Sequence, residues 1–340
     1  MNRYSRQLSI VGLEGQKLIS DAAVLVVGTG GIGCPVLTYL AAAGVGKIIL
    51  VDKDKVELTN LHRQIIFNER DIGLYKAIRA GEYLRQLNSD ISVESYASEL
   101  DIELSRQLIP TVDLVIDGTD NYQTRYLIND ICVIYGTPFI SSSVLNDIVQ
   151  LVLFNTKKIC YRCVYPKAPP AGMIPNCEEA GVLGTVTGIA GTLTANLALH
   201  YLLKLENSGH SVMRIFNAMD FSLTTFPIIP NEECEICKRK NDKLDYLESN
   251  INEFGIRLED IDRNEYFLVD IRDRSERETI KLDDDLFFPI KDNSNYDFFF
   301  NYKEKKILIY CAKGYRSKIF ASELRAKGVN AFYLKDGVSK

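Results

Sequence analysis

Short apolar runs alternate with longer segments of helical periodicity along the first half of the chain. Residues 23–28 (AVLVVG) and 47–52 (KIILVD) are apolar at nearly every position, which predicts strands buried on both faces of a parallel sheet. Helical spacing marks segments 31–43 and 75–87, and shorter strands are expected at 93–96, 114–117 and 139–141. This alternation predicts a doubly wound sheet that binds its ligand at the carboxyl ends of its strands.

A second pattern of the same kind begins beyond residue 265. YFLVDIR (266–272) and KKILIYC (305–311) predict two more buried strands, and ASELRAKG (321–328) predicts a helix. Between the two patterns lies the polar stretch KRKNDKLDYLESN, which is typical of a boundary between domains. We therefore predict an α/β protein with two domains, residues 1–245 and 246–340.

Segment 181–203 is the strongest candidate for a membrane span, but Thr, Asn and His interrupt it. Its many small residues favour close packing, so we interpret it as a buried helix. The N-terminal MNRYSRQLSI lacks the apolar core of a signal peptide, and a net charge of −5 gives no basic surface for nucleic acid. We expect a cytoplasmic protein with no membrane or nucleic-acid partner, whose eight cysteines stay reduced.

The first predicted strand runs into a glycine-rich turn, GTGGIGC. Gly28 allows a tight turn, Gly30 and its neighbour Gly31 let backbone N–H groups approach a phosphate, and Gly33 lets the next helix pack against the strand. Asp52 ends the second strand at the offset where Rossmann sites bind a ribose. The turn predicts a nucleotide site, and on its own it fits a nicotinamide-dependent oxidoreductase equally well.

The residues after Asp52 are not typical of dehydrogenases. DKDKVELTNLHRQ brings further polar side chains to the ligand-facing edge of the sheet, namely Asp54, Asn60, Arg63 and Gln64. A guanidinium offers two parallel donors to phosphate oxygens, which suits a triphosphate better than a buried nicotinamide.

Two further charges are expected at the same edge. Lys76, in GLYKA, begins the next helix, where a flexible cation reaches the same phosphates, and Asp120, in VIDGTDN, follows another strand. A carboxylate at that position suits Mg²⁺ held jointly by protein and phosphates. Each charge taken singly is also consistent with a solvated surface residue, but together they favour ATP with Mg²⁺.

The cysteines form two C-x-x-C pairs, Cys160 with Cys163 and Cys234 with Cys237. Together they complete a tetrahedral set of four thiolates with no open position, which predicts structural Zn²⁺. A redox dithiol is the alternative, and it is disfavoured because neither pair lies at a thioredoxin-like strand–helix junction. Cys34 and Cys132 lie in apolar helical segments and are expected in the core.

At this point the sequence resembles a known family. RYSRQ, GTGGIGC, D-x-D-x-V-x-x-x-N-L-x-R-Q, the GLYK lysine and GTDN, over about residues 1–240, look like the MoeB/ThiF adenylyltransferases that activate ubiquitin-like sulfur-carrier proteins. The resemblance implies a Rossmann-like mixed sheet with structural zinc, and AMP transfer to the C-terminal carboxylate of a carrier ending in Gly-Gly.

The same resemblance assigns roles to individual residues. Asp52 would hold the ribose of ATP and Asp120 the Mg²⁺, while the phosphates would be bound by Asn60, Arg63, Gln64 and Lys76. Arg6 would reach the triphosphate of a partner subunit, which implies a homodimer. Cys177, in IPNCEEAGVLG, resembles a family cysteine that links covalently to the activated carrier in some members and is dispensable in others.

The second domain also resembles a known family. Cys311 begins CAKGYRS directly after a predicted strand, where backbone N–H groups and Arg316 would stabilise a thiolate or persulfide. This loop and FLVDIRDRSERE are similar to rhodanese domains over about residues 251–340. The usual Gly-His-Ile segment is replaced by ETIKLDDDLFFPI, so two interpretations of Cys311 stay open: a sulfur-carrying residue, or a core cysteine at a strand end.

We therefore predict an adenylyltransferase of sulfur-carrier proteins that also transfers sulfur from a Cys311 persulfide, with a cysteine desulfurase as candidate donor. The product would be a carrier thiocarboxylate, used for molybdopterin, thiamine or thiolated tRNA. Three alternatives stay open: adenylation of a short peptide in secondary metabolism, a nicotinamide-dependent oxidoreductase, and a non-catalytic zinc-stabilised interaction module.

Overall fold

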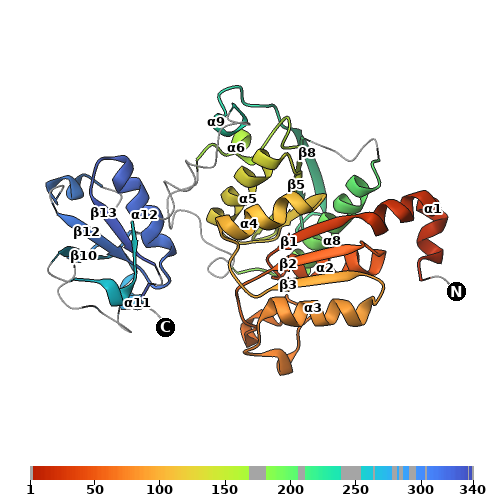
Figure 1. Cartoon of the computed structure of the whole chain (residues 1–340), viewed down its shortest axis with the longest axis horizontal. Helices are drawn as coiled ribbons and strands as arrows, with labels where there is room; N and C mark the ends of the chain where they lie inside the picture. The colour runs from red at the N-terminus through yellow and green to blue at the C-terminus, as the bar shows by residue number, and fades with distance from the viewer. Residues whose placement is uncertain are drawn as a thin grey trace. The chain divides into compact units, whose positions relative to one another are not determined.

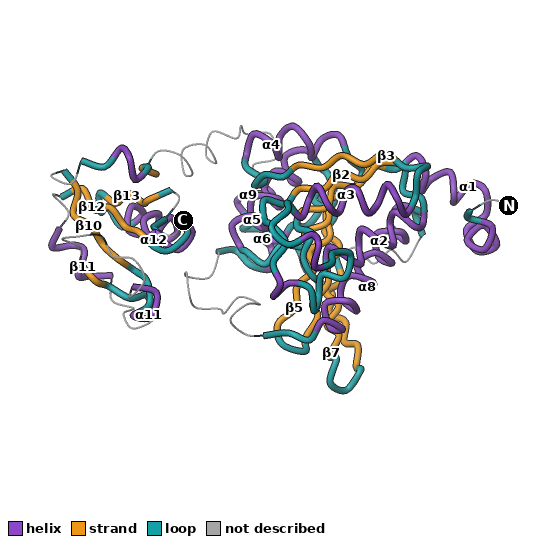
Figure 2. Tube along the Cα trace, turned by 90° about the horizontal axis from the view of Figure 1, so that it is seen from below, coloured by secondary structure: helices purple, strands orange, loops and turns teal. Residues whose placement is uncertain are grey.

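The computed structural model describes residues 3–167, 181–205, 211–238, 254–262, 265–277, 282, 286–290, 296–302, 305–335 and 337–338. These residues form two compact units, one containing the described residues up to 238 and the other those from 254 onward (Figures 1 and 2). The predicted domain boundary near residue 245 lies outside the described residues and stays a prediction.

The described part of the first unit is built on an eight-stranded mixed sheet, in the order β3-β2-β1-β4-β5-β6-β7-β8. Its first five strands run parallel and its last three pairings are antiparallel. The strands are β1 (Ala23–Val27), β2 (Lys47–Val51), β3 (Ser92–Tyr96), β4 (Leu114–Asp117), β5 (Phe139–Leu145), β6 (Ile148–Phe154), β7 (Val212–Asn217) and β8 (Ser222–Pro227). The doubly wound mixed sheet predicted from the sequence is confirmed.

Helices cover both faces of this sheet (Figure 1). They are α1 (Ser5–Asp21), α2 (Gly33–Ala43), α3 (Lys76–Leu87), α4 (Ile102–Leu108), α5 (Tyr122–Tyr135), α6 (Tyr161–Val164), α8 (Gly184–Leu202) and α9 (Glu235–Lys238). Short 3₁₀ turns occur at η1 (Leu58–Asn60), η2 (Glu69–Asp71) and η3 (Ile109–Thr111). The strands predicted at β1, β2 and β4 agree with the structure to within one residue.

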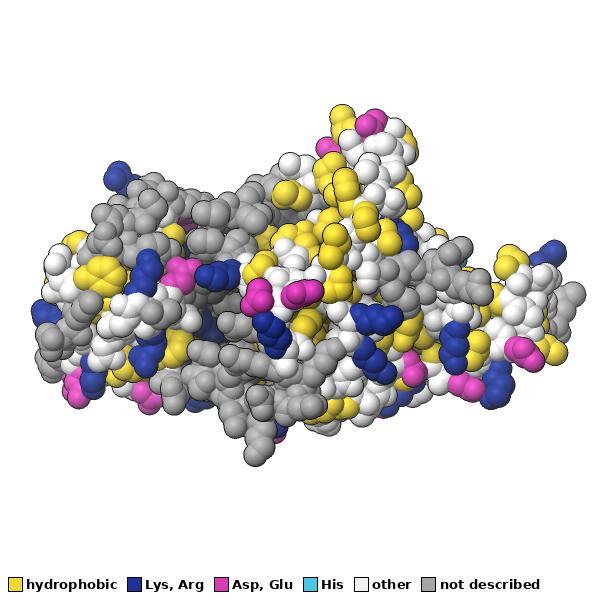
Figure 3. All heavy atoms as spheres, turned by 90° about the horizontal axis from the view of Figure 1, so that it is seen from above, with side chains coloured by type: hydrophobic (Ala, Val, Ile, Leu, Met, Phe, Trp, Pro, Cys, Tyr) yellow, Lys and Arg dark blue, Asp and Glu magenta, His cyan; other side chains and the backbone are white. Residues whose placement is uncertain are grey.

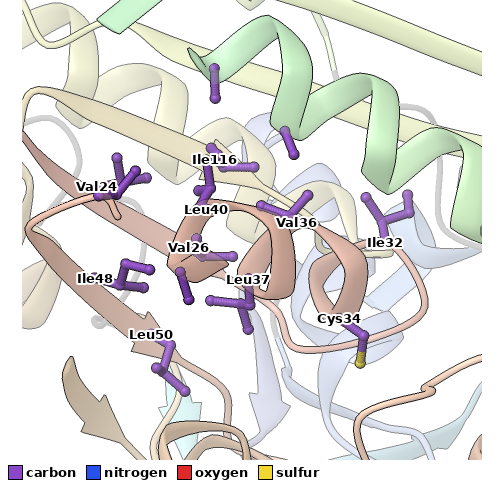
Figure 4. Packing of buried hydrophobic residues seen from close by; sticks show 14 of the residues in the cluster. Val24, Val26, Ile32, Cys34, Val36, Leu37, Leu40, Ile48, Leu50 and Ile116 are labelled. Atoms are coloured by element: carbon purple, nitrogen blue, oxygen red, sulfur yellow. The ribbon is translucent and has the colours of Figure 1, made fainter. Parts of the chain in front are cut away.

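The main core forms where α2, α3 and α8 pack against one face of the sheet. Figure 4 shows Val26 of β1 and Ile116 of β4 beside Leu37 and Leu40 of α2, all with buried side chains. Because strands at the sheet centre are covered on both faces, their sequences are apolar at nearly every position. This packing fixes the carboxyl ends of β1, β2 and β4, where the predicted nucleotide residues follow.

The segment predicted to be a buried helix forms α8, and residues along its length face the core. Among the described residues no helix combines the length and the apolar character required to cross a bilayer. The segment 166–184 is rich in Pro, Gly and Ala, which predicts a long loop, and it falls mainly on residues 168–180, outside the described residues.

The described part of the second unit is a five-stranded parallel sheet, in the order β11-β10-β12-β13-β9. Its strands are β9 (Gly255–Ile256), β10 (Tyr266–Asp270), β11 (Leu286–Phe287), β12 (Lys306–Tyr310) and β13 (Ala331–Leu334). Its helices are α11 (Arg274–Arg277) and α12 (Tyr315–Ala326), with 3₁₀ turns η4 (Leu258–Asp260) and η5 (Tyr296–Tyr302). The predicted strands at β10 and β12 and the helix after them are confirmed.

Candidate functional site

The glycine turn lies where the strand order of the first sheet reverses, between β1 and β4. Gly28 has a φ of +89°, and a Cβ there would lie 2.9 Å from the carbonyl oxygen of Gly118 in the turn after β4. A Cβ on Gly33 would lie 2.1 Å from the oxygen of Gly28, so only glycine lets α2 start this close to the strand. Crevices at such reversals bind ligands in open α/β sheets.

Around Gly30 the space is open. A Cβ built on this residue meets only the Nε2 atom of Gln64, at 4.0 Å. Gln64 is buried, and its Oε1 atom has no hydrogen-bond partner among the described residues. A buried amide oxygen without a partner is costly, so its position beside an open glycine turn fits a site completed by a polar ligand.

Asp52 is held in place by the glycine turn itself. Its carboxylate accepts hydrogen bonds from the backbone N–H and the hydroxyl of Thr29, both at 2.7 Å, and from the Asp54 N–H at 2.8 Å. Burial raises the pKa of the Asp52 carboxyl above its ordinary value, although the positive charge of Lys76 opposes the shift. The carboxylate at the end of β2 is therefore oriented toward the same crevice.

Lys76 is the first residue of α3, as predicted, and is 6% exposed. Its Nζ atom lies 3.4 Å from the exposed carboxylate of Asp54. A nearly buried ammonium with one exposed partner is available for further anionic contacts.

The other predicted phosphate residues lie in the segment after β2. Asn60 is buried, and its Oδ1 atom accepts from the Glu57 N–H at 3.1 Å, so this side chain stabilises the η1 turn. Arg63 donates to the Thr59 carbonyl at 3.0 Å and lies 2.9 Å from His62 Nε2. Arg63 and Gln64 both lie in the segment that follows β2, at the edge of the sheet where the sequence predicts them.

Asp120 is exposed in the turn between β4 and α5, and Arg6 is exposed on α1. Asn121 follows Asp120, and its side chain caps α5 by accepting from the Thr124 N–H at 2.8 Å. The proposed contact of Arg6 with a second subunit stays a prediction. Cys177 lies outside the described residues.

The four predicted zinc ligands converge. The sulfur atoms of Cys160, Cys163, Cys234 and Cys237 lie within 4.8 Å of one another, with measured separations of 3.4–3.8 Å. A tetrahedral ion with zinc–sulfur bonds of about 2.3 Å needs sulfur separations near 3.8 Å, so this set fits Zn²⁺.

The core assignments of Cys34 and Cys132 are confirmed, because both side chains are fully buried. Burial raises the pKa of the Cys34 thiol to about 12 and that of Cys132 well above its ordinary value. Neither thiol is a nucleophile near neutral pH. No disulfide joins any two cysteines of the described segments.

Cys311 follows β12 and is 1% exposed. Its sulfur accepts from the backbone N–H of Ser317 at 3.5 Å, in the first turn of α12, and lies 3.5 Å from the Ser317 hydroxyl. The helix begins after Gly314, whose φ of +82° turns the loop back over the sulfur. A helix N-terminus favours a thiolate or persulfide at this position.

The structure adds two ion pairs that the sequence analysis did not predict, and one of them includes Arg316, the arginine expected to stabilise Cys311. Arg316 pairs with Glu276, and Arg272 forms a fully buried two-bond pair with Asp270, at 2.9 and 3.0 Å. Although burial opposes it, the contact with Arg316 lowers the pKa of the Glu276 carboxyl. The spacing Asp270-x-Arg272-x-x-x-Glu276, directly after a strand, was the available signal.

Comparisons with known proteins agree with this geometry. A family model described as the ThiF family matches residues 4–236, and one described as a rhodanese-like domain matches residues 257–340. The chain is 38% identical over 245 residues to the Thermus thermophilus sulfur carrier protein adenylyltransferase. The aligned segment covers 70% of this chain and 90% of that protein.

Two further similarities extend the comparison. The Anopheles gambiae adenylyltransferase and sulfurtransferase MOCS3 is 41% identical over 239 residues, 69% of this chain and 54% of that protein, so the chain matches about half the length of this relative. Crystal structures of E. coli MccB are similar in fold. The one with ATP has a TM-score of 0.59 at 25% identity and covers 70% of this chain and 75% of MccB.

Proposed function

The chain belongs to the ThiF family and carries a rhodanese-like domain, and on that premise we propose that it is an adenylyltransferase of ubiquitin-like sulfur carriers. In this proposal it uses Mg²⁺ and ATP to adenylate the C-terminal Gly-Gly carboxylate of the carrier. The observation that carries the proposal is the glycine turn close to Asp52 and Lys76. Beside it lies the buried Gln64 oxygen, which has no hydrogen-bond partner in the part of the chain that the structure describes.

The chain's residues would perform the first reaction by positioning and electrostatics. Asp52 accepts from the ribose hydroxyls of ATP, while Arg63 and Lys76 neutralise its phosphates. Asp120 would hold Mg²⁺ together with the phosphates, and the ion would supply a positive charge that stabilises the leaving pyrophosphate. The carrier carboxylate attacks the α-phosphorus and pyrophosphate leaves. No general base is needed because the carboxylate is already ionised.

The second reaction would use Cys311 as a persulfide. Its terminal sulfur attacks the acyl carbon of the carrier adenylate, AMP leaves, and the carrier becomes joined to Cys311 through a disulfide. A thiol reductant then splits that disulfide and releases the carrier thiocarboxylate and free Cys311. Support comes from the helix N-terminus at Ser317, and a cysteine desulfurase is the proposed source of the sulfur. Two active centres on one chain raise the effective concentration for the transfer.

Zn²⁺, a homodimer and a cytoplasmic location complete the proposal. The four convergent cysteines would hold Zn²⁺ as a structural ion that joins the end of β6 to α9. The exposed apolar residues Ile10 and Leu13 on α1, next to Arg6, support a second copy as the partner of this helix. Unpaired cysteines among the described residues fit a reducing compartment.

A protein carrier is favoured over a short peptide by an exposed apolar surface at the β7–β8 hairpin. Figure 3 shows hydrophobic side chains gathered on this projection, and four of them form what we call the hairpin patch: Met219, Phe221, Leu223 and Phe226. Exposed apolar side chains gathered on one projection are typical of a protein-docking surface. We propose that the carrier docks here.

Peptide adenylation is the second candidate, because the fold is similar to MccB, one structure of which is a complex with N-formylated MccA. The two candidates predict different outcomes of ATP–pyrophosphate exchange assayed with Mg²⁺ and small Gly-Gly-terminated proteins. Exchange that depends on one such protein supports the carrier proposal, and exchange driven equally well by a free short peptide refutes it.

A substitution in the hairpin patch provides a second test of the carrier proposal. Phe221 has a positive φ of 59°, a conformation that aspartate accepts readily, so Phe221→Asp leaves the fold intact. We expect it to raise KM for the carrier about tenfold while KM for ATP is unchanged, because one large apolar anchor contributes over 1 kcal/mol. Leu258→Asp, at an exposed leucine of the second unit, is the matched control and should change neither value.

A further inference from the structure

A buried polar network runs from the Asp120 turn to the zinc cysteines, and nothing in the adenylation chemistry requires it. It begins at Asp117, the last residue of β4, whose carboxylate is fully buried. That carboxylate accepts from the backbone N–H of Thr119 at 3.0 Å and from its hydroxyl at 2.6 Å. Arg125 of α5, itself buried, donates to the other carboxylate oxygen at 2.5 Å.

Arg125 also contacts the backbone of Thr119 directly. Its Nη2 atom donates to the carbonyl oxygen of Thr119 at 2.8 Å. Asp117 and Arg125 therefore fix the N–H, the hydroxyl and the carbonyl of the residue that directly precedes Asp120. Two forked, charge-assisted contacts of this kind restrict backbone rotation more than a single hydrogen bond does. We call these contacts of Asp117 and Arg125 with Thr119 the clamp, and they fix the backbone from which the Asp120 side chain extends.

The zinc turn is attached to the same helix. Tyr161 follows the zinc ligand Cys160, and its ring lies beside Arg125, whose guanidinium carbon is 5.9 Å from the tyrosine ring centroid. The backbone N–H of Tyr161 donates to the side chain of Asn129 at 2.7 Å. Next in the turn, Arg162 makes a two-bond ion pair with the buried Asp130, at 2.7 and 2.8 Å. Helix α5 thus holds the Asp120 turn near its start and the zinc turn at its middle.

We propose that Arg125 is a positioning residue for the Mg²⁺ ligand Asp120, and that the zinc turn acts on nucleotide binding through Tyr161 and Arg125. This inference rests on the proposed adenylation function. In it the zinc cysteines do more than hold the fold together. They keep Tyr161 against Arg125, which keeps the Thr119 carbonyl fixed and Asp120 aimed at the metal. Loss of the zinc turn weakens Mg²⁺ binding at the nucleotide site.

The test measures equilibrium binding of a non-hydrolysable ATP analogue by calorimetry, over a titration of Mg²⁺, in the full-length zinc-loaded protein. Arg125→Lys keeps the charge but cannot contact both Asp117 and Thr119. We expect it to raise the Mg²⁺ concentration for half-maximal binding about tenfold, since charge-assisted hydrogen bonds are lost. Binding at saturating Mg²⁺ is expected to change less than threefold, because Arg125 is buried and is not among the residues that we propose to bind the nucleotide.

Tyr161→Leu tests the link to the zinc turn and is the milder change. We expect a roughly threefold shift in the Mg²⁺ requirement, while Tyr161→Phe, which keeps the ring over Arg125, shifts it less. Zinc depletion of the wild-type protein should act in the same direction as Tyr161→Leu. In the Arg125→Lys background neither change should add a further shift, because the coupling passes through Arg125.

Val133→Ala provides the control for general destabilisation. Val133 is a buried residue toward the C-terminal end of α5, so its truncation lowers stability while the clamp stays intact. Its Mg²⁺ titration is expected to match the wild-type curve. If Arg125→Lys folds with a wild-type Mg²⁺ requirement, or if zinc depletion shifts Arg125→Lys as much as wild type, the inference is wrong. If the wild-type protein binds no nucleotide at all, the proposed function fails instead.

Discussion

Two glycines of the same turn are expected to respond to alanine in opposite ways. At Gly33 the added Cβ would lie 2.1 Å from the oxygen of Gly28, a backbone atom that cannot move without shifting β1 or α2. At Gly30 the nearest atom is a side-chain nitrogen 4.0 Å away. Gly33→Ala therefore perturbs the fold, while Gly30→Ala perturbs only the space that we assign to the phosphates of ATP.

The magnitudes follow from these distances. Overpacking against backbone costs about 3 kcal/mol, which lowers the melting temperature of a unit of this size by roughly 6–12 °C. Gly30→Ala should change stability by less than about 0.5 kcal/mol. By holding phosphates away from backbone N–H groups it removes charge-assisted hydrogen bonds of about 1.5–3 kcal/mol, so Kd for ATP should rise about 10- to 150-fold.

Calorimetry measures both quantities on the zinc-loaded full-length protein, as a melting curve and as a binding isotherm with an ATP analogue and Mg²⁺. The reasoning predicts a stable Gly30→Ala protein that binds ATP poorly and an unstable Gly33→Ala protein. A Gly30→Ala protein with wild-type affinity for ATP would refute the assignment of this turn to the phosphates. A Gly33→Ala protein as stable as wild type would refute the argument for close packing of α2.

Three further predictions concern other parts of the chain. Cys234→Ser should lose zinc, measured by elemental analysis, and lower the melting temperature of the first unit; full zinc content would exclude Cys234 as a ligand. Cys311→Ser should abolish thiocarboxylate formation, detected by mass spectrometry of the carrier, while pyrophosphate exchange continues; loss of both activities would contradict the division of labour. Glu276→Gln should destabilise the second unit by about 1 kcal/mol at neutral pH. Because the pKa of Glu276 lies below its ordinary value of 4.5, this difference should disappear as the pH falls through that lowered pKa; a difference that persists in acid would refute the ion pair as its cause.

The parallel half of the first sheet was predictable because its strands are buried on both faces. Burial of β1, β2 and β4 leaves continuous apolar runs that no loop would carry. The antiparallel half was not predicted in detail. Every residue of β8 is exposed, and its sequence SLTTFP has no apolar periodicity, so its strand conformation depends on pairing with β7. Helix α1 was missed for a related reason, since it contains Gly12 and exposes much of its apolar surface.

The same distinction between local sequence patterns and tertiary packing applies to the candidate site. Asp52, Lys76 and Asp120 follow strand ends or begin a helix, and their positions in the sequence predicted their positions in the fold. The contacts of Arg125 with Asp117 and Tyr161 were not predictable, because Tyr161 lies far from the others in sequence and reaches Arg125 only when α6 packs against α5. Local patterns predict residues at sheet edges, whereas buried polar networks depend on tertiary packing.

The four convergent cysteines have a consequence for the unfolded chain. A metal bound to them closes a loop between positions 74 residues apart in the sequence, which contains α8 and the β7–β8 hairpin. By analogy with a disulfide, a cross-link over that length removes about 4 kcal/mol of chain entropy from the denatured ensemble. Unlike a disulfide, the link survives in a reducing environment and is reversible with the metal supply. The edge strand β8 is thereby tethered near its C-terminal end, so hydrogen exchange along β7 and β8 should report whether the metal is bound.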